Sequence, residues 1–95
     1  MITRIVKLSI DPKHKKKFTA LFLVNRNKIT AFNGCYSVEL LADMNDESIF
    51  FTYSKWESTT AIEAYRNSTT FREIWDNVKP LFNDKALAWS TQAIH

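Results

Sequence analysis

The segment CYSVELLADMNDESIFFTYSKW, residues 35–56, decides the fold. Two runs of mixed apolar and polar side chains, 35–42 and 49–56, flank a short polar stretch that is typical of a turn. We therefore predict two strands that pair as a hairpin. Alternation along the second strand gives one face made of Phe50, Thr52, Ser54 and Trp56. Since neither face of this strand is wholly polar, we expect protein to cover both faces of the sheet.

A strand and a helix precede the hairpin. Residues 1–10 alternate regularly, and one face of this strand carries Ile2, Arg4, Val6, Leu8 and Ile10. Asp11 and Pro12 then indicate the N-cap and the first position of a helix. Its apolar stripe, at i, i+3, i+4 spacing, comprises Phe18, Leu21, Phe22, Asn25, Ile29 and Phe32. We expect Gly34, in a left-handed conformation, to end this helix.

Two helices and a strand follow the hairpin. Ser58 predicts the cap of a short helix over residues 59–67. Thr70 and Glu73 form a T-x-x-E capping box that predicts the start of another helix. The apolar stripe of that helix comprises Phe71, Ile74, Trp75, Val78, Leu81 and Phe82. Residues 86–94 alternate again and predict a fourth strand.

The predicted order β-α-β-β-α-α-β describes a single α+β domain over residues 1–95, a ferredoxin-like sandwich with an antiparallel four-stranded sheet. Helices on one side leave the face with Ile5, Phe51 and Tyr53 open. Because an exposed apolar patch of that size usually marks an association surface, we expect a homodimer that packs sheet against sheet. The alternative is a monomer that covers the sheet with its own termini.

Scarce residue types exclude several kinds of cofactor and metal site. Gly34 is the only glycine, so neither a GxGxxG loop nor a Walker-type phosphate loop is possible. Cys35 is the only cysteine, which excludes an internal disulfide and any CxxC motif. The two histidines, His14 and His95, are too far apart for an HExxH helix. These counts exclude those particular phosphate-loop, disulfide and metal motifs.

The charge is unevenly distributed along the chain. Residues 1–30 contain eight Lys or Arg against one acidic residue, whereas residues 31–95 contain five against nine. The lysine-rich stretch 13–17 has no interleaved aromatic residue, so we predict a solvated helix face and no nucleic-acid partner. No apolar run approaches the length of a membrane helix, and a lone cysteine without a secretory signal indicates the cytoplasm.

Four segments together carry a resemblance that covers essentially the whole chain. They are MITRIVKLSIDP (1–12), GCYSVELLAD (34–43), FFTYSKWES (50–58) and AIEAYRNSTTFREIW (61–75). In this order and spacing the sequence resembles the antibiotic biosynthesis monooxygenase family. The resemblance implies a dimeric α+β barrel and oxidation of phenolic or quinol-like aromatics by molecular oxygen, without metal or flavin. Related proteins on this fold degrade haem or isomerise lactones, so the fold alone constrains function weakly.

Such chemistry requires a pocket that binds a flat ring and stabilises its anion. Between the sheet and the helices the chain offers aromatic walls, one cation and polar donors. The candidates for catalysis are Trp56, which matches the family's W-x-S position, Tyr65, Arg4 and Asn25. The candidates for the substrate pocket are Thr52, Ser54, Phe71 and Trp75.

Each catalytic candidate also has a purely structural interpretation. Tyr65 and Trp75 lie at positions typical of core packing. Arg4 can extend its guanidinium to the rim of the sheet, and Asn25 can satisfy a neighbouring backbone group.

The sequence also departs from the family at positions that bear on catalysis. Many members have histidine where this chain has Tyr65 and Thr70, which favours a second hypothesis, a non-catalytic dimeric module that binds an aromatic ligand. A haem-binding or haem-degrading protein is a third hypothesis. It is weakened because Trp75 stands where the haem-degrading members have their proximal histidine.

Overall fold

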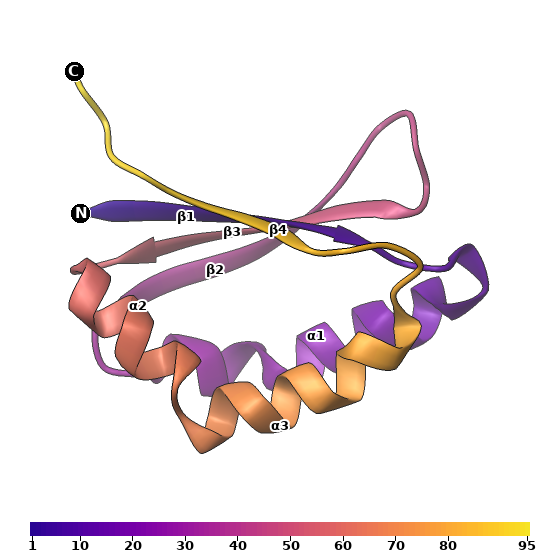
Figure 1. Cartoon of the computed structure of the whole chain (residues 1–95), viewed down its shortest axis with the longest axis horizontal. Helices are drawn as coiled ribbons and strands as arrows, with labels where there is room; N and C mark the ends of the chain where they lie inside the picture. Colours follow the sequence, from indigo (N-terminus) through magenta and orange to yellow (C-terminus); the bar gives the residue numbers. More distant parts are fainter.

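The structure, a computed structural model, describes residues 1–95. Its elements are β1 (Ile2–Ser9), the 3-10 helix η1 (Pro12–His14), α1 (Lys15–Thr30), β2 (Cys35–Ala42), β3 (Ile49–Trp56), α2 (Thr59–Arg66), α3 (Thr69–Val78), the 3-10 helix η2 (Lys79–Leu81) and β4 (Leu87–Thr91). This order confirms the predicted α+β class and its ferredoxin-like arrangement (Figure 1). None of the helices combines the length and apolar character needed to cross a membrane.

The four strands form one antiparallel sheet in the order β2-β3-β1-β4. The predicted hairpin is present, since β2 pairs with β3. In the register of β1 with β3, Arg4 lies opposite Ser54 and Val6 lies opposite Thr52. Figure 1 shows all three α-helices on one side of this sheet, so the chain has two layers.

The main core lies between α1, α3 and the central strands. It is a cluster of six buried apolar residues: Leu8, Ile10, Phe18, Phe50, Val78 and Leu81. The rings of Phe18 and Phe50 lie 5.1 Å apart between centroids and join α1 to β3. Burial of such side chains contributes roughly 1.5–3 kcal/mol each, which fixes the helices against the sheet.

Several local signals in the sequence act as predicted. The Asp11 carboxylate accepts a hydrogen bond from the backbone N–H of Lys13 at 3.1 Å, and Ser58 Oγ accepts one from the N–H of Ala61 at 3.2 Å. Gly34 has a φ of +90°, the left-handed region that favours glycine.

Three boundaries differ from the predictions. The capping box is wrong, because Ser68 caps α3: its Oγ accepts a hydrogen bond from the N–H of Phe71 at 3.1 Å. Helix α1 ends at Thr30, and the chain then turns through residues 31–34 before β2. Strand β4 stops at Thr91 because that residue already lies opposite Thr3, near the start of its partner strand.

The face of the sheet opposite the helices is bare (Figure 1). Its cross-strand neighbours are largely apolar: Ile5 lies opposite Tyr53 on one side and opposite Trp89 on the other. Trp89 is 48% exposed and Leu87 equally so. The predicted open apolar face is therefore present.

Candidate functional site

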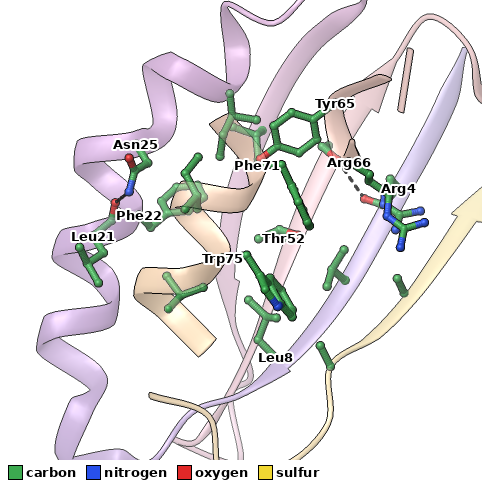
Figure 2. A pocket seen from close by; sticks show the side chains of 18 of the residues that line it. Arg4, Leu8, Leu21, Phe22, Asn25, Thr52, Tyr65, Arg66, Phe71 and Trp75 are labelled. Atoms are coloured by element: carbon green, nitrogen blue, oxygen red, sulfur yellow. Dashed lines mark hydrogen bonds between the residues drawn. The ribbon is translucent and has the colours of Figure 1, made fainter. Parts of the chain in front are cut away.

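A cavity of about 420 Å³ lies between the sheet and the helices. Twenty residues from both layers line it, and fifteen of them are hydrophobic. The structure brings together all eight residues predicted from the sequence: Arg4, Asn25, Thr52, Ser54, Trp56, Tyr65, Phe71 and Trp75. Figure 2 shows several of these side chains around the cavity, with Arg4 and Asn25 at opposite ends. A volume in the range of roughly 300–1,000 Å³ suits a small organic ligand.

Four aromatic rings form a continuous wall of this pocket. The ring of Tyr65 lies 5.2 Å from those of Trp56 and Phe71. Phe71 in turn stacks on Trp75, with ring centroids 5.8 Å apart and 13° between the planes. These rings come from β3, α2 and α3, so the wall bridges both layers. Such a wall can hold a flat aromatic molecule through its ring faces.

Trp56 is held in one orientation by its neighbour on β3. The indole is 1% exposed, and its Nε1–H donates a hydrogen bond to Ser54 Oγ at 2.9 Å. The Ser54 hydroxyl donates in turn to the backbone carbonyl of Arg4 at 3.4 Å. Ser54 is therefore a positioning residue for Trp56 and for the strand that carries Arg4.

Tyr65 has a hydroxyl that takes part in none of the side-chain hydrogen bonds within the chain, although its ring is largely buried. Burial and, to a lesser extent, the nearby Cys35 raise the pKa of the Tyr65 phenol to about 12. The phenol is therefore protonated at neutral pH, and its O–H is available as a donor to a ligand rather than as a base.

Arg4 is the predicted cation and extends from the central strand β1. Its Nη1 donates a hydrogen bond to Ser90 Oγ on β4 at 3.0 Å. Burial lowers the pKa of the Arg4 guanidinium, and the charge of Arg66 lowers it further. Arginine nevertheless remains charged at any physiological pH, so the pocket contains a fixed positive charge.

Asn25 is buried on α1, as its place on the apolar stripe predicted. Its amide nitrogen donates to the backbone carbonyl of Leu21 at 2.8 Å, within the same helix (Figure 2). One of its two N–H groups is thus used inside α1, which agrees with the structural interpretation and leaves the other for a ligand. Thr52 lies in the middle of β3, opposite Val6.

Sequence reasoning missed Arg66, the last residue of α2, which also lines the cavity. The sequence held no direct signal for it, because neighbouring residues on a helix do not share a face and the place of Arg66 follows from how α2 lies on the sheet. The twenty lining residues include no Asp, Glu, His or Lys, so the charged side chains of the pocket are Arg4 and Arg66. No group of three His, Cys, Asp or Glu side chains in the chain is arranged to hold a metal ion.

The fold and the pocket together define the class of protein. It is a small ferredoxin-like domain with an aromatic-walled cavity between its sheet and its helices. The family model for antibiotic biosynthesis monooxygenases matches residues 1–76, which is most of the chain. The chain therefore belongs to the antibiotic biosynthesis monooxygenase family. A search of curated protein sequences finds no significant match.

Solved structures agree with this fold over the full length of the chain. One from Nitrosomonas europaea, assigned to the same family, has a TM-score of 0.89 and 15% identity, covering 100% of both chains. A second antibiotic biosynthesis monooxygenase has a TM-score of 0.91 and 16% identity, again covering 100% of both. Rv0793 from Mycobacterium tuberculosis has a TM-score of 0.86 and 17% identity, covering 99% of this chain and 95% of its own. At these identities the similarity establishes the fold alone.

Proposed function

We propose that the protein is a cofactor-independent monooxygenase that oxidises a small aromatic or quinol-like substrate with molecular oxygen. One observation carries the proposal: the pocket combines a continuous aromatic wall with charged groups that are exclusively cationic. Membership of the family supports the reaction class.

The electrons for this reaction come from the substrate itself. A quinol that loses a proton becomes an anion that can reduce oxygen directly. For a naphthalene-type quinol, one O₂ is consumed: one oxygen atom enters the ring to give a hydroxyquinone, and the other leaves as water. Atoms and electrons balance without an external reductant. The protein's task is to bind the ring, favour its anion and exclude competing reactions.

The residues of the pocket suit these roles. Trp56 and Trp75, with Phe71, contact the ring faces, and the Arg4 guanidinium stabilises the developing oxyanion. The O–H of Tyr65 and the remaining N–H of Asn25 are neutral donors that orient the substrate. Because no lining carboxylate or imidazole can serve as a base, substrate deprotonation depends on solvent and on the lowered substrate pKa beside a guanidinium.

We also propose that the working unit is a homodimer formed through the bare sheet faces. The row Tyr53, Ile5 and Trp89 gives an apolar surface across three strands. Two copies related by a two-fold axis can bury this surface against itself. The lone cysteine supports a reducing compartment, and we place the dimer in the cytoplasm.

The direct test is oxygen consumption by metal-free protein with 1,4-naphthohydroquinone and anthrone. We expect uptake above the rate in buffer, and Tyr65→Phe and Trp75→Phe should each lower kcat/KM by about tenfold or more. The matched control is Tyr36→Phe, which changes the same residue type at an exposed position that does not line the pocket. If neither substrate is consumed faster with protein than in buffer alone, the proposed oxidation of quinols and anthrones is contradicted.

The second candidate function is a non-catalytic module that binds an aromatic ligand. The absence of any imidazole or carboxylate among the lining residues favours it, because a general base must lie within hydrogen-bond reach of the proton that it removes from the substrate. Saturable binding of a quinol without oxygen uptake would support this function. The haem hypothesis is weaker, because Trp75 stands at the position where haem-degrading members of the family have the histidine that binds the haem iron.

A further inference from the structure

Two arginines converge at one end of the pocket. Arg4 comes from the first half of β1 and Arg66 from the last turn of α2, and Figure 2 shows their side chains together beside Tyr65. Neither arginine has an acidic partner. The one salt bridge in the chain lies at η1, where Lys13 Nζ is 3.8 Å from Asp11 Oδ2.

The two like charges, one half-buried and one exposed, have no counter-ion within the chain. Two like charges repel more strongly beside an apolar cavity than in water, because the walls lower the local dielectric constant. Burial lowers the pKa of the Arg4 guanidinium, and the charge of Arg66 lowers it further. An arginine on a central strand is seldom half-buried without a carboxylate partner.

Structural roles account for only part of the two guanidinium groups. Arg4 uses one donor for Ser90 Oγ, which leaves four of its five N–H groups. Arg66 stands in the last turn of α2, where a cation stabilises the helix dipole, but this effect does not require its place on the pocket wall. None of the side-chain hydrogen bonds within the chain involves the Arg66 guanidinium.

We propose that the substrate carries, in addition to its oxidisable ring, an anionic group of the carboxylate class that binds between Arg4 and Arg66. The inference rests on the pocket assigned under the proposed function, and it narrows the substrate to aromatic acids. A ring oxyanion alone can be stabilised by one guanidinium, whereas two planar donor groups from different elements can hold a carboxylate from two sides. Tyr65 and Trp56 then contact the ring next to that group.

The test compares two inert probes that differ only in charge, 2-naphthoate and 2-naphthalenemethanol, by calorimetric titration at pH 7.5. A hydrogen-bonded ion pair of this kind is worth roughly 1.5–3 kcal/mol, so we expect the wild type to prefer the naphthoate by about tenfold or more. Arg66→Gln and Arg4→Gln should each reduce this preference severalfold while leaving the affinity for the alcohol nearly unchanged. Arg66→Lys should keep part of it.

Arg72→Gln is the matched control, because Arg72 is an exposed arginine of α3 that does not line the pocket. Unchanged affinity for the alcohol also verifies that each variant is folded. Equal affinity of the wild type for the two probes would overturn the inference, as would a preference that survives the double substitution of Arg4 and Arg66.

The two proposals fail separately. The titration involves no oxygen, so a charge preference that depends on the arginines supports the anion site even if no quinol is oxidised. Oxidation of 1,4-naphthohydroquinone together with equal affinity for the two probes would instead support the proposed function and overturn the anion site.

Discussion

The indole of Trp56 donates its Nε1–H to the hydroxyl of Ser54, two residues earlier on the same strand, at 2.9 Å. The pair lies under the helices, where the indole is almost fully buried. One hydroxyl therefore fixes the orientation of the ring that begins the aromatic wall. The finding separates two functions on β3: Trp56 provides the surface, and Ser54 holds it in place.

Removing this hydroxyl should leave a buried donor without a partner. We expect Ser54→Ala to lower the free energy of unfolding by about 1–3 kcal/mol, measured by urea denaturation. Ser37→Ala, on the neighbouring strand, is the control and should change it by less than about 0.5 kcal/mol. In a double-mutant cycle with Trp56→Phe, additive effects would show that the hydrogen bond contributes nothing.

Gly34 should tolerate no side chain. Its φ is +90°, and a Cβ added there would lie 2.5 Å from the Cβ of Ala61 on α2. We expect Gly34→Ala to cost about 1–3 kcal/mol from backbone strain, with a further loss from the clash. In an Ala61→Gly background the clash is absent, so Gly34→Ala should cost less free energy of unfolding there than in the wild type. The part of the cost that remains is the backbone strain. Full recovery in the double variant would mean that the backbone there is unstrained.

Tyr65 should make the stability of the fold depend on alkaline pH. Its pKa is raised from 10 to about 12, so the folded state retains the phenol proton that the unfolded state loses first. This contribution is complete below about pH 10 and is lost as the pH rises toward 12. Between about pH 10 and 12, the free energy of unfolding should fall by about 1 kcal/mol or more less in Tyr65→Phe than in the wild type, as measured by urea unfolding at a series of pH values. The exposed Tyr36, changed to Phe, is the control; an equal effect there would contradict the assignment.

The bare sheet face should control the oligomeric state. Introducing a charge on this face, as in Trp89→Glu on the edge strand β4, should convert the proposed dimer to a monomer in light scattering at micromolar concentration, because the charge would be desolvated in the interface. Val24→Glu provides the control, since Val24 is 70% exposed on α1, on the other side of the sheet. A wild-type monomer would refute the proposed assembly, as would a Trp89→Glu dimer.

The element order and most of the pocket could be predicted from local patterns. Alternation in β1 and β3 assigns Arg4, Thr52, Ser54 and Trp56 to one face, and the antiparallel register then sets Arg4 opposite Ser54. Helical spacing likewise directs Phe71 and Trp75 toward the sheet. These residues belong to regular elements, whose periodicity fixes where the side chains lie.

Features that depend on contacts between elements could not be predicted in this way. The cap of α3 is Ser68 rather than Thr70, because three hydroxyl residues follow one another at 68–70 and local pattern alone does not say which of them caps the helix. A register shift between Cys35 and Ser37 sets Cys35 opposite Trp56, which simple alternation does not reveal. Arg66 was missed for the same reason: its proximity to Arg4 follows from how α2 lies on the sheet.

The central claim, oxygenation in this pocket without a cofactor, is tested most directly by isotope labelling. Metal-free protein is incubated with 1,4-naphthohydroquinone under ¹⁸O₂, and the product is examined by mass spectrometry. We predict one ¹⁸O atom per molecule of hydroxyquinone, formed faster than in buffer and at least about tenfold more slowly with Tyr65→Phe than with the control Tyr36→Phe. A product without ¹⁸O, or one formed at the buffer rate, would contradict the account.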